Sequence, residues 1–248
     1  MCCLFLAASS TVAIAQTNVV DLVNPIIGTN GMGHTFPGAC VPFGLVQLSP
    51  DTDTIPHNVD GKYQPRSYEY CAGYQHKDSS IVGFSHTHFS GTGHSDLGDI
   101  LIMPTTGTLK LNPGTATNPD GGYRSRFSHG TEISRPGYYE VMLTDYGVKA
   151  QLTTTQRVGI HKYTYPTNSE NQRIILDMIH GIYNYDGKVL WTNIRVENDT
   201  LVTGYRITNG WARTNYTYFA MSFSKPITHY GCEEKAKVNY RAVMPSSI

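Results

Sequence analysis

The chain has 248 residues, of which 40% are hydrophobic and 15% are charged, and its formal net charge is zero. This length suits one large β-sandwich or barrel domain and little more. Because 19 basic residues balance 19 acidic ones, charge gives no reason to expect a nucleic-acid partner.

The N-terminus has the pattern of a secretory leader. A short apolar run covers residues 4–15, and small residues at Ala13 and Ala15 precede Gln16. This pattern predicts a signal peptide over residues 1–15 and a mature domain over residues 16–248, with a secreted or periplasmic location; a buried first strand is the alternative.

Cleavage would leave Cys40, Cys71 and Cys232. This odd number argues against a disulfide-dense scaffold and allows one bridge, whose partners the sequence does not specify.

A glycine-punctuated loop follows, from Gly28 to Gly38, and it contains His34, Thr35 and Phe36. We expect a strand over residues 43–48, ended by Pro50-Asp51, and then a polar surface loop over residues 51–66.

Three tyrosines come next, Tyr68, Tyr70 and Tyr74, around Cys71 and Gly73. They could form an aromatic platform for a sugar ring or a small hydrophobic core under a loop, and the sequence leaves both open.

The stretch from Ile81 to Met103 has the densest set of titratable side chains. Apolar flanks at residues 82–84 and 100–102 predict strands, and Ser90 to Gly93 form a glycine-rich bend between them. The titratable residues are His86, His88, His94, Asp96 and Asp99. Polar groups beside a glycine-rich bend on rigid strands are typical of a binding site.

Beyond Met103, short β-branched and aromatic segments recur with turn residues between them. The turns include Asp145-Tyr146-Gly147, Asn198-Asp199 and Asn209-Gly210, and no window shows a helical apolar period. The pattern predicts an all-β domain, an antiparallel β-sandwich with few helices. The expected strands lie within residues 107–111, 122–127, 138–145, 148–156, 158–165, 173–179, 188–198, 200–208 and 217–224.

His86 and His88 are two residues apart, so on a strand they would share one face and could bind a metal, with His94, Asp96 or Asp99 as a third ligand. The alternatives are imidazoles that hydrogen-bond to backbone and, as we prefer, imidazoles that donate to substrate hydroxyls. The residues required for a cupin-like or metallo-β-lactamase-like site are missing. No carboxylate pair suited to glycoside hydrolysis and no Gly-x-Ser-x-Gly elbow stands out.

Three stretches, residues 23–52, 70–107 and 135–166, resemble the N-terminal domain of the glycoside hydrolase family 92 α-mannosidases. The resemblance extends from about Val19 to Tyr240, and the Gly28–Gly38 loop and the Gly83–Asp99 run are its most specific parts. It implies a β-sandwich from a secreted or periplasmic, inverting exo-enzyme that removes α-linked mannose from N-glycans or mannan with calcium.

In that family the general acid, the general base and the calcium ligands belong mainly to a following (α/α)6 barrel. The resemblance therefore implies that this chain stops before the barrel, that it has no catalytic residue or metal site of its own and is inactive alone, and that its partners are the barrel and a mannose-containing glycan. The residues it assigns to the mannose pocket are His34, Thr35, Phe36, Tyr70, His86, His88, Gly91 and Thr92.

Two other functions are alternatives: a glycan-binding module without chemistry, and a cupin-like metal enzyme built on His86 and His88, for which the expected Glu is missing. Both tryptophans, Trp191 and Trp211, lie in the later strands, so the linkage preference stays open.

Overall fold

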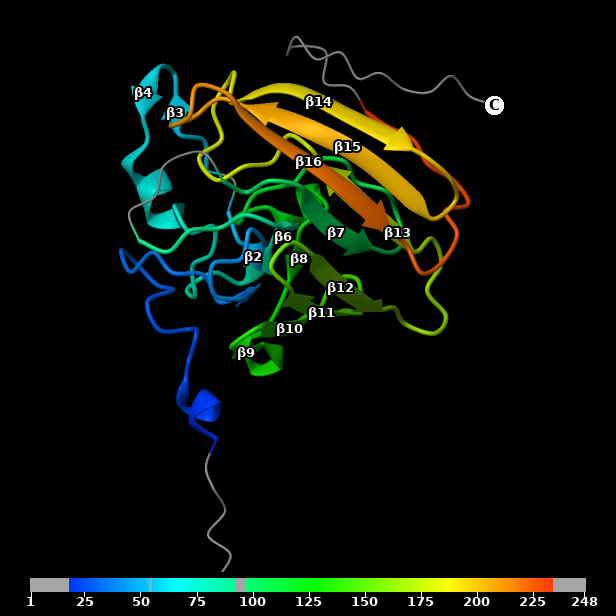
Figure 1. Ribbon diagram of the computed structural model, residues 1–248, viewed down its shortest axis with the longest axis horizontal. Helices are drawn as coiled ribbons and strands as arrows, with labels where there is room; N and C mark the ends of the chain where they lie inside the picture. The colour runs from blue at the N-terminus through cyan, green and yellow to red at the C-terminus, as the bar shows by residue number, and fades with distance from the viewer. Residues whose placement is uncertain (1–17, 54, 92–96, 234–248) are drawn as a thin grey trace, which may run out of the picture.

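A computed structural model describes residues 18–53, 55–91 and 97–233 of the chain (Figure 1). Antiparallel strands dominate it, as the sequence predicts, and the helices among these residues are four short 3-10 turns. The predicted signal peptide (residues 1–15), Thr92, His94 and Asp96 lie outside the described residues.

Two facing sheets form the sandwich. The first has the order β1 (Ala39–Cys40), β2 (Gln47–Asp51), β6 (Gly83–Ser85), β7 (Leu101–Thr105) and β13 (Arg173–Asp177). The second has the order β12 (Gly159–Thr164), β11 (Val148–Thr154), β10 (Tyr138–Leu143) and β9 (Ile133–Arg135).

One hydrophobic core lies between these sheets. Leu48, Phe84 and Leu101 enter it from the first sheet, and Val141 and Leu152 enter it from the second. Burial alternates strictly along β10 and β11, with the buried residues on one face. This period of two is what places every second side chain of a strand in the core.

A third sheet, β14 (Val189–Val196), β15 (Leu201–Thr208) and β16 (Asn215–Ser222), lies beyond the first sheet on the side away from the second (Figure 1). Arg206 of β15 joins it to the sandwich, because its buried guanidinium lies 3.1 Å from Asp99 and also donates to the carbonyl of His180. The predicted hairpins at Asn198-Asp199 and Asn209-Gly210 connect its strands.

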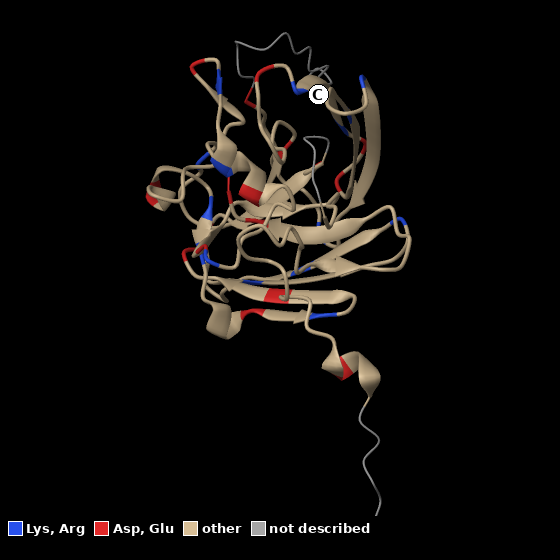
Figure 2. Cartoon of the chain, turned by 90° about the vertical axis from the view of Figure 1, so that its left-hand side faces the viewer, with Lys and Arg blue, Asp and Glu red and all other residues tan. Residues whose placement is uncertain are grey.

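Short elements complete the fold. Two small ribbons pair β3 (Asn58–Val59) with β4 (Lys62–Tyr63) and β5 (Ser80–Ile81) with β8 (Ser125–Arg126). The 3-10 turns are η1 (Val19–Leu22), η2 (Pro65–Tyr70), η3 (Pro119–Gly121) and η4 (His129–Thr131). In the described part of the chain, no helix has the length and apolar character needed to cross a bilayer. Basic and acidic residues are interspersed over loops and strands (Figure 2).

Two predicted strands are wrong. Residues 43–48 begin in a turn, where Phe43 has a φ of 57° and is fully exposed, and the strand starts only at Gln47 and runs through Pro50. Proline is tolerated there because β1 pairs only with Gln47 and Leu48. Strand β1 has therefore ended before Pro50, and no β1 carbonyl lacks a donor because proline has no N–H. Residues 107–111 form a loop in which Leu109 and Leu111 are exposed, so their alternation fits no sheet.

Candidate functional site

The glycine-rich loop and the end of the 86–91 run are hydrogen-bonded to each other. The Gly91 N–H donates to the carbonyl of His34 at 2.8 Å, and the Gly91 carbonyl lies 3.6 Å from the Cys71 sulfur. The His34 ring packs edge-on against Tyr68 with 4.9 Å between ring centroids. The fold therefore brings three segments, around residues 34, 68–71 and 91, to one place.

The loop is held in shape by its own backbone and by Gln75. The Gln75 side chain accepts from the Gly31 N–H at 2.7 Å and donates to the Gly31 carbonyl at 2.8 Å. Gly33 crosses over Gly28 so closely that a Cβ on Gly33 would lie 2.2 Å from the Gly28 carbonyl oxygen. Glycine is required at this crossing because no side chain fits between the two backbones.

An aromatic cluster lies beside the loop. Tyr68 and Tyr183 stack with centroids 6.4 Å apart and an interplanar angle of 13°. The His57 ring packs near three tyrosine rings. The distances between ring centroids are 5.6 Å to Tyr183, 5.0 Å to Tyr63 and 5.9 Å to Tyr185. Tyr63 is exposed and Tyr68 is partly exposed, so the cluster reaches the surface. Such ring faces can stack on a sugar.

Apolar side chains are exposed around the same loop and run. Ile27 is 74% exposed, Met32 62% and Phe89 57%. These values are high for large apolar residues so close in the fold, and exposed groups of this kind mark binding or docking surfaces.

Asp51 organises the buried interior behind the loop. Its two carboxylate oxygens accept hydrogen bonds from His88 Nε2 at 2.8 Å and His180 Nε2 at 2.7 Å, and all three side chains are almost completely buried. Burial alone would raise the pKa of Asp51, but the two histidines outweigh it and hold that pKa well below its usual range.

The other nitrogen of His88, Nδ1, lies 2.8 Å from the Gln47 carbonyl. Both nitrogens of His88 thus face oxygen acceptors, which fix the orientation of the ring between Gln47 and Asp51.

The protons of His86 follow from its partners. Its Nδ1 lies 2.7 Å from the Ile100 carbonyl, which can only accept, so Nε2 of a neutral ring must be the acceptor. The partner of Nε2 is His161 Nε2 at 3.0 Å, which therefore donates, and His161 Nδ1 accepts from Tyr163 Oη at 2.7 Å. Burial lowers the pKa of His86 to about 4, so the ring is neutral at pH 7.

The structure places the predicted pocket residues in two groups. His34, Thr35, Phe36 and Gly91 lie on the loop and run described above, although the His34 ring is buried and Thr35 donates to the Ile27 carbonyl. Tyr70, His86 and His88 point inward. Tyr70 is 6% exposed and its hydroxyl contacts Asp78, and burial, reinforced by that carboxylate, keeps its pKa above the usual tyrosine range.

His86 and His88 do not form a metal pair. The expectation assumed that both lie on one strand, but β6 ends at Ser85, and the two rings turn to different partners. Asp99, a predicted third ligand, binds Thr87 and Arg206 instead. Both imidazoles are instead hydrogen-bonded to backbone carbonyls of the domain, which is one of the two alternatives to a metal pair.

Sequence reasoning missed His57, His180 and Tyr183. His180 follows β13 and reaches Asp51 over a separation of 129 residues. The residues around His180 give no local sign of that contact, which depends on the pairing of β13 with β7.

The family model and the solved structures agree on one family. A sequence model described as the glycosyl hydrolase family 92 N-terminal domain matches residues 22–245. A family 92 α-mannosidase from Bacteroides thetaiotaomicron, solved in complex with mannoimidazole, is 45% identical with a TM-score of 0.76 over 85% of this chain. A family 92 inverting mannosidase from Bacteroides thetaiotaomicron VPI-5482 is 27% identical with a TM-score of 0.62 over 88% of this chain.

A protein from Arthroderma benhamiae, named an uncharacterized secreted glycosidase, is 28% identical in an alignment of 170 residues that covers 65% of this chain. The chain spans 26% of each of the two solved structures and 19% of the Arthroderma protein.

Proposed function

Because this chain belongs to glycosyl hydrolase family 92, as an N-terminal domain of that family, we propose that it shapes the substrate site of a secreted, inverting exo-α-mannosidase acting on N-glycan or mannan. Support for the substrate comes from the structural neighbours, which are mannosidases. Support for secretion comes from the fungal relative, whose name describes it as secreted.

The observation that carries the proposal is the convergence at the glycine-rich loop. His34, Gly91 and the Tyr68–Tyr183 stack meet there, and exposed apolar residues surround them. The Nε2 atom of His34 is buried and has no hydrogen-bond partner among the described residues. A buried polar atom of this kind is costly unless another molecule or segment pairs with it, and a sugar hydroxyl can do so.

The chemistry itself is proposed to lie outside this chain. Inverting hydrolysis needs one carboxylic acid to protonate the leaving oxygen and one carboxylate to activate water on the opposite face. Here the buried carboxylates Asp51, Asp99 and Glu132 are each bound by side chains of the domain. They are unsuited to the acid and base roles, and we propose that the chain alone does not hydrolyse mannosides.

Calcium is proposed for the whole enzyme, but the one close group of histidine, cysteine and carboxylate side chains among the described residues does not fit it. Calcium takes six to eight oxygen ligands. The one close group of three potential ligands among the described residues has two imidazoles and one carboxylate. No step is therefore derived from calcium in this chain.

The decisive experiment compares the chain with a longer protein that contains it, using α-mannobiosides and added calcium. We expect turnover, with inversion detected by NMR of the released sugar, only in the longer protein. Tyr68→Ala in that protein should raise KM about fivefold, because loss of one stacking ring removes roughly 1 kcal/mol of binding. Tyr218→Ala, which removes an exposed ring on β16, is the matched control. Turnover by the chain alone, or equal effects of the two substitutions, would refute the proposal.

A second candidate is a glycan-binding module without chemistry. The exposure of Tyr63 at the edge of the aromatic cluster favours it, because an exposed ring is available for sugar. Millimolar or tighter mannose binding by the chain alone, abolished by Tyr68→Ala, would support this function. We give it second place because the exposed apolar residues around the glycine-rich loop are better explained by docking of another segment.

A further inference from the structure

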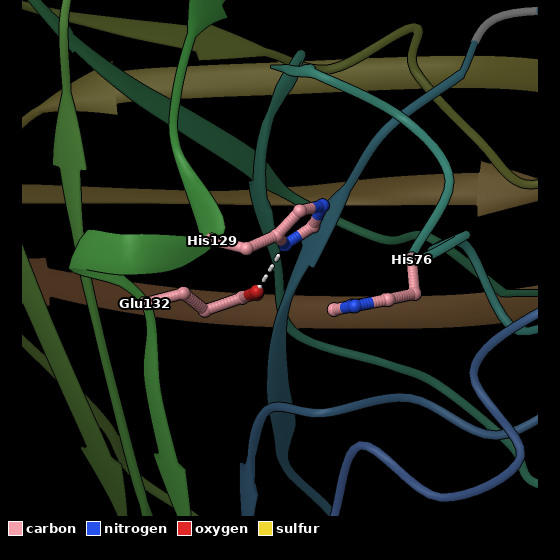
Figure 3. Close-up of side chains that lie close together, drawn as sticks. All are labelled: His76, His129 and Glu132. Carbon is pink, nitrogen blue, oxygen red and sulfur yellow. Dashed lines mark hydrogen bonds and ion pairs between the residues drawn. The ribbon is translucent and has the colours of Figure 1, made fainter.

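A cluster of His76, His129 and Glu132 connects three parts of the chain (Figure 3). His76 follows Gln75, His129 begins η4, and Glu132 is the residue between η4 and β9. One potential ligand atom of each residue lies within 4.8 Å of those of the other two. The two imidazole centroids are only 4.0 Å apart. Within residues 18–53, 55–91 and 97–233, no other three histidines, cysteines or carboxylates come so close.

Glu132 is held in place like a metal-binding carboxylate. Its side chain is 3% exposed. Tyr139 Oη donates to Oε1 at 2.7 Å, and Tyr74 Oη lies 2.9 Å from Oε1 and 3.0 Å from Oε2. Hydrogen bonds from outside the ligand set fix the orientation of ligating carboxylates in metal sites. Oε2 is also the oxygen that faces His129 Nδ1, at 2.7 Å.

The two histidines are placed to share a cation. Two protonated rings at this separation would repel each other, whereas two neutral rings can both bind one metal ion. His129 is exposed, so water can reach the remaining side of the cluster. Two imidazole nitrogens and one carboxylate oxygen form a donor set that suits Zn²⁺, with water as a fourth ligand, and does not suit calcium.

We propose that His76, His129 and Glu132 form a binding site for a divalent transition metal, with Zn²⁺ as the ion of best fit. The hydrogen bond between His129 and Glu132 is then the metal-free arrangement, in which a proton occupies the place of the cation.

The site would steady the glycine-rich loop. The His76 N–H donates to the Thr29 carbonyl at 2.8 Å, and the neighbouring Gln75 holds Gly31. A metal bound to His76, His129 and Glu132 would connect the segment of Gln75 and His76 to β9 and the second sheet. Its role is structural, because the cluster contributes no group to the aromatic cluster or to the His34–Gly91 contact.

The test is calorimetric titration of ZnCl₂ into the chain after chelator treatment and alkylation of the exposed thiols. Separate titrations use CaCl₂. His129→Ala and His76→Ala remove one ligand each; the His129 side chain is exposed, and its ring touches the core only edge-on at Phe127, with 5.0 Å between ring centroids. The matched control is His229→Ala, which removes another exposed histidine.

We expect one zinc ion per chain, at least tenfold weaker binding in each ligand variant, and unchanged binding in the control. Thermal unfolding should shift upward with zinc in the parent and the control but not in His76→Ala/His129→Ala. Equal zinc affinity in the parent and this double variant would overturn the site, as would stronger binding of calcium than of zinc.

Discussion

Replacement of Asp51 by Asn tests the interior that supports the glycine-rich loop. The carboxylate accepts from His88 at 2.8 Å and from His180 at 2.7 Å, and its side chain is 1% exposed. Asn has nearly the same shape but one acceptor oxygen, so its NH₂ group must face one of the two imidazole donors. The variant therefore loses the negative charge and leaves a buried donor without an acceptor.

The expected cost follows from these two losses. An unsatisfied buried donor costs about 1–3 kcal/mol, and removal of one member of a buried ion pair costs about 3–5 kcal/mol in all. We expect Asp51→Asn to lower the free energy of unfolding by about 3–5 kcal/mol. With a urea m-value of about 2.5 kcal/mol/M, the midpoint should fall by about 1–2 M.

Urea unfolding followed by tryptophan and tyrosine fluorescence measures this shift. Asp120→Asn is the matched control, because the Asp120 carboxylate is also paired, with Arg126 at 2.6 Å, but its side chain is 73% exposed. Exposed pairs contribute about 0–1 kcal/mol, so the control should change little. A loss below about 1 kcal/mol for Asp51→Asn would refute the reasoning.

The same pair of proteins gives a pH test of the charge. The pKa of Asp51 is lower in the folded than in the unfolded chain, so its stabilisation is complete above the unfolded pKa of about 4 and is lost as pH falls below it. The stability difference between the parent and Asp51→Asn should narrow as pH drops from about 5 to 3. A constant difference would show that shape, not charge, causes the loss.

Three further predictions concern other residues. Because His86 is neutral in the fold with a pKa of about 4, against about 6.5 when unfolded, stability should fall as pH drops from 6.5 to 4, and His86→Leu should flatten that slope in pH-dependent unfolding. Gly33→Ala should destabilise by about 2 kcal/mol or more in urea, whereas Gly31→Ala, with open space at its Cβ, should cost about 1 kcal/mol; equal costs would contradict the close crossing. A thiol reagent should label exposed Cys40 and Cys232 but reach buried Cys71 only after unfolding, and fast labelling of Cys71 would contradict its place in the core.

The alternation of apolar residues was enough to predict the sandwich. The prediction holds along β10 and β11 because one face of each strand is buried. Apolar residues therefore recur at every second position of the sequence. The turn residues at Asp145, Asn198 and Asn209 located three hairpins for a similarly local reason. The family resemblance, also read from the residues, is confirmed over residues 22–245.

Side-chain roles were decided by contacts between distant segments. The sequence gives His86 and His88 the same spacing as a metal pair, but Ile100, His161 and Asp51 determine what each ring does. His76 and His129 are 53 positions apart by their numbering, and nothing local to either indicates that they meet beside Glu132. Periodicity reports which face of a strand is buried, whereas the partners of a buried polar group depend on which strands become neighbours, and only the tertiary structure of this protein fixes that.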